Sequence, residues 1–375
     1  MINKKNKSKV INFGCRLNSF EAEVIKSFIK KNNIENTLVF NSCSVTHEAE
    51  RKVQQSIRKY NRKFPDMNIV VTGCAAQINP NKYINMEGVK SIIGNHEKMN
   101  NEVWSNIGNY QNLNVKNIMN IKTINNNIVE SFDGKARAYV EIQQGCNHRC
   151  TFCIIPFGRG NNRSVPIGLI VDRVKKLVMA GYNEVVLTGV DITDYGLDLP
   201  GQPSLSQMIR RLLKLVPELK QLRLSSIDCS EIDNDFWDLI KFEERLMPHL
   251  HISLQSGDDI ILKRMKRRHS KKEAMEFCNK AKKFRPNITF GADLIVGFPT
   301  ESDKMFNNTL KMVSDCDLVY LHVFPYSIRN GTPASKMPQV PNEVKKIRSK
   351  VLRNLGQQKL SNYLYTLVGK TKKIL

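Results

Sequence analysis

The stretch from Ala136 to Gly160, ARAYVEIQQGCNHRCTFCIIPFGRG, decides the fold of the larger part of the chain. Its first nine residues have the composition of a strand. Cys146, Cys150 and Cys153 then follow within eight positions, and the next cysteine is Cys229. The stretch therefore predicts a strand that opens into a loop of three thiols with no local fourth partner.

The pattern of strand followed by helix continues beyond this loop. Six β-rich segments are separated by helical patterns such as PIGLIVDRVKKLVMAG and SLSQMIRRLLKLV. Six repeats are too few for a closed eight-stranded barrel, but they suit a partial (β/α)6 TIM-like barrel with its chemistry at the carboxyl-terminal mouth. The six predicted strands are 136–144, 183–189, 221–226, 250–256, 288–298 and 317–327.

Three apolar runs near the N-terminus share one design. KVINFGC ends at Cys15, TLVFNSC at Cys43 and NIVVTGC at Cys74, and a helical pattern follows each run. Strand, turn and helix repeated three times predict a parallel-sheet α/β domain, in which the carboxyl ends of the strands meet at one edge. The three thiols would then lie together as ligands of a metal cluster, although each alone could be a buried small hydrophobe.

Length and composition indicate more than one domain. The chain has 375 residues, and the weakly periodic, asparagine-rich segment from about Asn100 to Asp133 has the character of a connector. We expect an N-terminal domain over 1–125, a second domain over 134–360 and a basic tail over 361–375. No secretory signal or membrane-spanning run is evident, and nine cysteines are an odd number, so we expect reduced thiols and a cytoplasmic location.

Basic residues are in large excess. Lys and Arg number 58 and Asp and Glu 35, a formal net charge of +23 that favours a polyanionic partner. A lysine- and asparagine-rich proteome would give the same balance. Basic residues gather in LKRMKRRHSKK (262–272) and in the tail from Lys345 to Lys373, where they could contact phosphates or form a solvated helix face.

The spacing of Cys146, Cys150 and Cys153 favours iron over zinc. Structural zinc sites use paired cysteines across a long spacer and need four ligands, although His148 could supply the fourth. A cubane cluster held by three thiolates leaves one iron open to an external ligand. That iron can chelate S-adenosylmethionine (SAM), whose reductive cleavage gives methionine and a 5'-deoxyadenosyl radical.

The motif CNHRCTFC resembles the CxxxCxxC signature of the radical SAM superfamily. The resemblance extends over essentially the whole chain through FGCRLNSFEAE, NSCSVTHEAERKVQQSIR, VTGCAAQ, CTFCIIPFGRGNNRSVP, VVLTGVDI, HISLQSGDD, DLIVGFPTE and VFPYSIRNGTPAS, which are similar to the methylthiotransferase family. The RLN after Cys15 and the SFEAE that follows resemble the branch that acts on N6-threonylcarbamoyladenosine in tRNA.

The resemblance implies two [4Fe-4S] clusters, a radical one on Cys146, Cys150 and Cys153 and an auxiliary one on Cys15, Cys43 and Cys74. One SAM would donate the methyl group and a second the radical that activates carbon 2 of the adenine. It also implies cofactor contacts by Phe152, Gly189, Asp191, Ser226, Gln255 and Gly297, which could equally serve turns and local backbone.

Other residues are less directly assigned. Arg159 and Arg163 could contact the cofactor or a phosphate, or form structural salt bridges. Cys229, Cys278 and Cys316 match no motif, and we expect them to be packed in the core.

The resemblance implies two partners, tRNA at an anticodon-loop adenosine and a one-electron reductant such as flavodoxin or ferredoxin. Members of the family typically end in a small β-barrel RNA-binding (TRAM) module, which we expect to be absent or truncated here. The alternatives are isopentenyladenosine tRNA or a ribosomal protein as the substrate, and a non-catalytic iron–sulfur electron carrier or RNA-binding protein.

Overall fold

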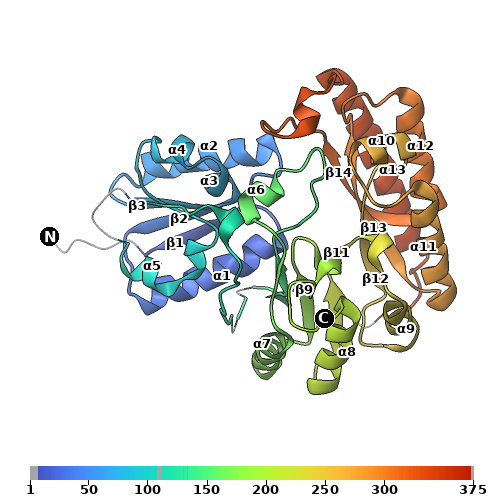
Figure 1. Cartoon of the computed structure of the whole chain (residues 1–375), viewed down its shortest axis with the longest axis horizontal. Coiled ribbons are helices and arrows are strands. Elements are labelled where there is room, and N and C mark those ends of the chain that lie inside the picture. The colour runs from blue at the N-terminus through green and yellow to red at the C-terminus, as the bar shows by residue number, and fades with distance from the viewer. Residues whose placement is uncertain (1–6, 108–111, 130, 133, 373–375) are drawn as a thin grey trace. The chain divides into compact units, whose positions relative to one another are not determined.

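The computed structural model describes residues 7–107, 112–129, 131–132 and 134–372 (Figure 1). They form two compact units. Unit 1 comprises the described residues of Met1–His148, Ile154–Tyr182 and Thr188–Val190, and unit 2 comprises those of Arg149–Cys153, Asn183–Leu187 and Asp191–Leu375.

Unit 1 contains a five-stranded sheet in which every neighbouring pair of strands is parallel, in the order β1-β2-β3-β4-β5. Strand β2 is buried along its whole length, as expected for a parallel sheet covered on both faces. The predicted parallel sheet is confirmed. The elements are β1 (Lys9–Asn12), α1 (Arg16–Lys31), β2 (Thr37–Ser42), α2 (His47–Lys63), β3 (Asn68–Gly73), α3 (Cys74–Ile78), α4 (Pro80–Ile84), β4 (Val89–Ile93), η1 (Glu97–Met99), α5 (Asn101–Ser105) and β5 (Asn112–Asn114).

The segment predicted as a connector contributes to this sheet, so that prediction is wrong in part. Strand β5 pairs with β4, and α5 buries Trp104 completely. A further turn, η2 (Ile118–Asn120), follows. The three residues of β5 are Asn-Leu-Asn, which carry no apolar run, so only pairing with a strand distant in sequence makes them a strand. Residues 108–111, 130 and 133 lie outside the described residues.

A short hairpin in unit 1 closes the cysteine loop. Strand β6 (Arg137–Glu141) leads into β7 (Gln143–Gln144), which pairs antiparallel with β8 (Arg163–Ser164). Gly145 has a positive φ of 70°, and a Cβ there would lie 1.9 Å from the carbonyl oxygen of Asn161, so only glycine fits this close approach. Helices α6 (Ile155–Arg159) and α7 (Ile167–Met179) also belong to unit 1.

Unit 2 continues the alternation of strand and helix. Strand β10 pairs parallel with β9, and β11, β12, β13 and β14 form a parallel sheet in that order. All six strands predicted from 136 onward are present. The remaining elements are β9 (Glu184–Thr188), η3 (Ile192–Asp194), α8 (Leu205–Leu215), β10 (Gln221–Leu224), β11 (Ser226–Ile227), η4 (Cys229–Glu231), α9 (Asn234–Phe242), β12 (His249–Gln255), α10 (Asp259–Arg264), α11 (Lys271–Phe284), β13 (Thr289–Val296), α12 (Asp303–Asp315), β14 (Leu318–Pro325), η5 (Pro333–Lys336) and α13 (Asn342–Tyr365).

The two faces of the β11–β14 sheet differ in chemistry. In β12, Leu250, Ile252 and Leu254 are almost fully buried on one face. Because side chains alternate along a strand, the other face carries the intervening polar residues His249 and His251, which precede the shift in register between Ile252 and Gln255. This polar face of the sheet positions several of the residues described below.

The C-terminal helix crosses the predicted boundary between the second domain and the tail. Helix α13 runs to Tyr365, so the predicted tail over 361–375 begins inside it, and residues 373–375 lie outside the described part of the chain. Among the described residues, no helix has both the length and the apolar composition needed to cross a bilayer.

Candidate metal and cofactor site

Three thiols lie where β1, β2 and β3 end, all within unit 1. Cys15 is the N-cap of α1, Cys43 directly follows β2, and Cys74 is the first residue of α3 after β3. A Cβ placed on Gly14 would lie 3.1 Å from the sulfur of Cys43, so the backbone beside Cys15 passes close to that thiol. Burial raises the pKa of Cys43 to about 12, and the nearby Cys74 and Cys15 thiols add to the rise. The structure thus brings together three thiols that are far apart in sequence.

A buried ion cluster, which we call the Glu21 cluster, lies beside these thiols and consists of Glu21, Lys98 and Arg159. Lys98 Nζ lies 2.6 Å from Glu21 Oε2, and Arg159 Nη1 lies 2.6 Å from Glu21 Oε1. The three side chains are 0%, 0% and 3% exposed, respectively. Burial by itself would raise the pKa of Glu21, but the charges of Arg159 and Lys98 outweigh it and lower the pKa to about 2.

Two amides connect the Glu21 cluster to the thiols. Asn95 accepts a hydrogen bond from Lys98 Nζ at 2.7 Å, and its Nδ2 donates to the sulfur of Cys74 at 3.6 Å. Asn18 accepts from Arg159 Nη2 at 2.8 Å and from the sulfur of Cys15 at 3.4 Å. The same Asn18 and Asn95 therefore hold both the buried charges and two of the sulfurs.

The Glu21 cluster contains two cations and one anion. Burial disfavours the charge of Arg159, but Cys74 and Glu21 counteract burial and hold the pKa of Arg159 well above its usual value. A buried cation needs a negative partner. A site of three thiols, of which Cys43 and Cys74 are buried and Cys15 is exposed, beside one surplus positive charge suits a group that binds the sulfurs as thiolates and carries net negative charge.

Arg159 and Arg163 follow the cysteine loop. Arg159 forms a structural salt bridge with Glu21, which is one of the roles predicted for it. Arg163 donates through Nη2 to the carbonyl oxygen of Arg159 at 2.5 Å, so it fixes the end of α6.

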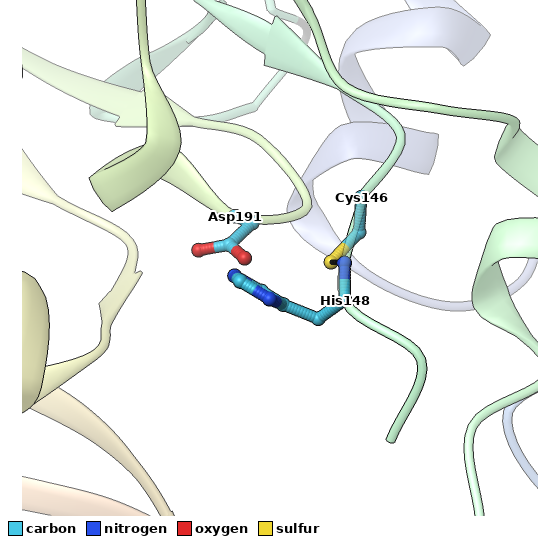
Figure 2. Close-up of side chains that lie close together, drawn as sticks. All are labelled: Cys146, His148 and Asp191. Carbon is cyan, nitrogen blue, oxygen red and sulfur yellow. Dashed lines mark hydrogen bonds between the residues drawn. The ribbon is translucent and has the colours of Figure 1, made fainter. Parts of the chain in front are cut away.

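Cys146 lies on the loop that follows β7 in unit 1, and the backbone N–H of His148 donates to its sulfur at 3.3 Å (Figure 2). The backbone N–H of Cys146 in turn donates to the carbonyl oxygen of Gly160 at 3.1 Å. The loop geometry therefore places a backbone N–H donor on the sulfur of Cys146.

Cys150 and Cys153 lie in unit 2, half-buried, with an arginine beside the first. Arg267 Nη1 donates to the sulfur of Cys150 at 3.6 Å, while Nη2 donates to Asp228 at 2.5 Å and to the carbonyl oxygen of Ser253 at 2.8 Å. Arg267 therefore holds a positive charge beside the Cys150 sulfur, and Asp228 and Ser253 fix its position.

Phe152, between those cysteines, packs edge-on against Phe298, with ring centroids 6.4 Å apart. Thr151 anchors the same segment, because its N–H donates to Met265 and its carbonyl oxygen accepts from Ala334. Hydrogen bonds to Met265 and Ala334 therefore fix the backbone of Thr151, two residues before Cys153, within unit 2.

The other predicted cofactor contacts lie at strand ends or on the polar face. Gly189 follows β9, and Asp191 is the N-cap residue of η3, where its carboxylate accepts from Thr193 Oγ1 at 2.9 Å. Ser226 begins β11 and pairs in register with His251. Gln255 ends β12 with a φ of 68°, an unfavourable conformation for a residue with a side chain.

Gly297 has a reason to be glycine that involves no ligand. Its φ is 67°, a Cβ there would lie 2.4 Å from Cγ of Lys345, and its N–H donates to Glu301 at 2.7 Å. The tight packing of α13 against this turn excludes a side chain.

Two arginines of the basic block at 262–272 are engaged within unit 2. Arg267 holds Asp228, and Arg268 forms an ion pair with Glu231. Sequence clustering could not reveal this, because the acidic partners lie more than thirty residues away. Cys229, Cys278 and Cys316 are buried, as expected for core cysteines.

Two family models match the chain. The Radical SAM superfamily covers residues 140–313, and the Uncharacterized protein family UPF0004 covers residues 7–94. Among solved structures, the radical S-adenosylmethionine methyltransferase TsrM from Kitasatospora setae is similar with a TM-score of 0.61 and 13% identity, over 83% of this chain and 68% of that one. The likeness shows the fold, so the partial barrel predicted from six strands is confirmed. The match to the Radical SAM superfamily, together with the relatives described next, shows that the chain is a radical SAM enzyme.

Similar proteins of named function show which family of radical SAM enzymes the chain resembles. The "Threonylcarbamoyladenosine tRNA methylthiotransferase MtaB" of Rickettsia prowazekii is 51% identical over 98% of this chain and 87% of its own length. The "tRNA-2-methylthio-N(6)-dimethylallyladenosine synthase" of Clostridium botulinum is 32% identical over 89% of this chain and 77% of its own length. The chain belongs to the methylthiotransferase family of radical SAM enzymes, in the branch of the threonylcarbamoyladenosine tRNA methylthiotransferases, and the resemblance seen in the sequence is confirmed.

Proposed function

We propose that this chain adds a methylthio group to carbon 2 of N6-threonylcarbamoyladenosine next to the anticodon of tRNA. One SAM serves as the methyl donor and a second as the radical source. The identity of 51% to the MtaB relative, over 98% of the chain, carries the proposal.

A direct test measures modified nucleosides in tRNA. A strain without this protein should lose the 2-methylthio derivative of threonylcarbamoyladenosine and accumulate the unmethylthiolated nucleoside, as measured by mass spectrometry of digested tRNA. Unchanged nucleosides would refute the proposal. Loss of 2-methylthio-isopentenyladenosine, or loss of a modification from a ribosomal protein, would assign the chain to the alternative substrates.

We also propose how the cofactors are held. Cys146, Cys150 and Cys153 hold a radical [4Fe-4S] cluster, and the three thiols of unit 1, Cys15, Cys43 and Cys74, hold an auxiliary one. When bound, the first supplies the electron that cleaves SAM and the second supplies the sulfur that is transferred.

The charge of the Glu21 cluster supports the auxiliary site. Three thiolates around a doubly positive cubane core leave one negative charge, and the surplus cation of Glu21, Lys98 and Arg159 matches it. Neutral thiols would leave that cation unbalanced in a buried environment. Lys98 acts through Asn95, which donates to Cys74, so the chain supplies both the charge and a hydrogen bond toward the sulfurs.

The cofactor assignment predicts a metal content. Anaerobically reconstituted wild type should contain about eight iron atoms, and each triple cysteine-to-alanine variant about four. Zinc as the only metal would contradict the assignment. Clusters that can be reduced without any cleavage of SAM would favour the electron-carrier alternative.

The remaining assignments follow from the proposed reaction. SAM is contacted by Phe152, Gly189, Asp191, Ser226, Gln255 and Gly297, several of which lie at strand ends, where ligands of α/β folds bind. Residues 1–125 form the auxiliary-cluster domain, 134–360 the radical SAM domain and 361–375 a basic tail. A flavodoxin or ferredoxin supplies electrons, and the enzyme works in the cytoplasm, where its tRNA substrate is found.

The basic surface supports binding of tRNA. Lys263, Arg264 and Lys266 are exposed on and just after α10, where they can contact phosphates. Bases in a single-stranded anticodon loop can leave the stack and enter a pocket, so an adenosine there is accessible to the enzyme.

A further inference from the structure

A cluster of two histidines and an aspartate, which we call the Asp293 cluster, lies on three neighbouring strands of unit 2. His251 is on β12, Asp293 on β13 and His322 on β14. One oxygen of Asp293, Oδ1, lies 3.0 Å from His251 Nε2 and 3.1 Å from His322 Nδ1. The two imidazole rings pack together with centroids 4.6 Å apart. None of these residues is assigned a role above.

The three side chains of the Asp293 cluster differ in their exposure to solvent. The His251 side chain is 7% exposed, Asp293 is 22% exposed and His322 is 57% exposed. Gly291, opposite His251 in the register, leaves room for the buried ring, because a Cβ there would lie 2.6 Å from His251 Nδ1. His251 is therefore packed in place, and it fixes the carboxylate of Asp293.

Asp293 in turn orients His322. Its carboxylate accepts from both imidazoles, so Nδ1 of His322 is the protonated nitrogen that donates to it. The other ring nitrogen is Nε2, and the side chain as a whole is 57% exposed. When the ring is protonated, both of its nitrogens are donors, so Nε2 can donate to an anion while Nδ1 donates to Asp293.

His322 lies on the polar face of the sheet. Its neighbour Leu321 faces α13, since a Cβ on Gly356 would lie 3.1 Å from Leu321 Cδ1, and alternation along β14 places His322 on the opposite face. That face also carries Ser226, which pairs in register with His251 and which we assign to SAM. A fixed donor on this face is suited to a polar or anionic group of a substrate held near SAM.

We propose that His322, oriented by Asp293 and His251, binds the carboxylate of the threonyl group on the substrate base. The inference rests on the proposed function. A threonylcarbamoyl group ends in a carboxylate, whereas a dimethylallyl group is entirely apolar. An oriented imidazolium therefore selects the first substrate, because a charged hydrogen bond forms with one group and not with the other.

The test uses the reconstituted holoenzyme and three anticodon stem-loop RNAs. They carry threonylcarbamoyladenosine, its carboxyl methyl ester, or dimethylallyladenosine. Wild type should methylthiolate the acid with a kcat/KM about 10- to 100-fold above that for the ester, which is the value expected for one hydrogen bond to a charged group. The variant His322→Phe should lower kcat/KM for the acid to the value for the ester, and leave the ester unaffected.

The matched control is His249→Phe. His249 lies on the same face of β12, but its Nδ1 pairs with Thr289 Oγ1 and its ring contacts Tyr320. This variant should keep the wild-type preference for the acid. Comparison of acid and ester on wild type tests the inference even if His322→Phe does not fold.

The outcomes separate the inference from the proposed function. A wild type that modifies the acid and the ester equally well overturns the inference and leaves the proposed function intact. A wild type that modifies neither threonylcarbamoyl RNA refutes the proposed function itself. Zinc that binds stoichiometrically to wild type but not to His322→Phe, with no change in substrate preference, would show a metal site and overturn the inference.

Discussion

Replacement of Glu21 by glutamine should strongly destabilise unit 1. Glu21 is the one carboxylate between Lys98 and Arg159 in the Glu21 cluster, with both contacts at 2.6 Å and no exposure to solvent. Glutamine keeps the shape and removes the charge, so two buried cations lose their anion. Breaking a buried pair costs about 3–5 kcal/mol. At about 2–4 °C per kcal/mol, the transition of unit 1 should fall by about 6–20 °C.

The assay is urea or thermal unfolding of the cluster-free protein, followed by tryptophan fluorescence. The chain has two tryptophans, and Trp104 donates to the carbonyl oxygen of Lys98 at 2.8 Å, so it reports on the Glu21 cluster directly. Wild-type Glu21 and the Glu21→Gln variant are compared in proteins that also carry Trp237→Phe, because this second substitution removes the tryptophan fluorescence of unit 2.

The control is Glu48→Gln, the same substitution in an exposed i,i+3 pair with Arg51 on α2. Exposed pairs contribute about 0–1 kcal/mol, so this variant should unfold close to wild type. If the free energy of unfolding of Glu21→Gln lies within about 1 kcal/mol of that of Glu48→Gln, the buried carboxylate does not compensate the two cations, and the reasoning from charge is wrong.

Three further predictions follow from the same region. The pKa of Glu21 is lowered from 4.5 to about 2, so its charge stabilises the fold above pH 4.5, and that stability is lost as the pH falls through 2. The difference in unfolding free energy between wild type and Glu21→Gln should therefore shrink by roughly 3 kcal/mol between pH 4.5 and pH 2. Gly73→Ala should cost at least about 2 kcal/mol in urea unfolding, because φ is 93° and the new Cβ would lie 2.3 Å from the carbonyl oxygen of Ser42; an unchanged midpoint would contradict this. Asn95→Leu, which removes the donor to Cys74, should lower the iron retained after anaerobic gel filtration toward about four atoms per chain, and retention equal to wild type would show that the hydrogen bond is dispensable.

The local pattern of the chain was sufficient to predict most of the strands and the position of Cys15, Cys43 and Cys74 at strand ends. Each of the runs that end at Cys15, Cys43 and Cys74 is a strand with a helix after it, and parallel strands place their carboxyl ends at one edge whatever the details of packing. The six strands after 136 were predicted for the same reason. Strand β5 was missed, because its three residues become a strand only through pairing with β4.

Only the tertiary structure decided which charged and polar residues surround those elements. Lys98 lies 77 residues from Glu21 and Arg159 lies 138 residues away, so no sequence pattern joins the Glu21 cluster. His251, Asp293 and His322 meet because of the register of three strands, and register depends on packing between segments that are far apart. Sequence periodicity reports which face of an element is buried, whereas the partners of a buried charge are set by the folded chain as a whole.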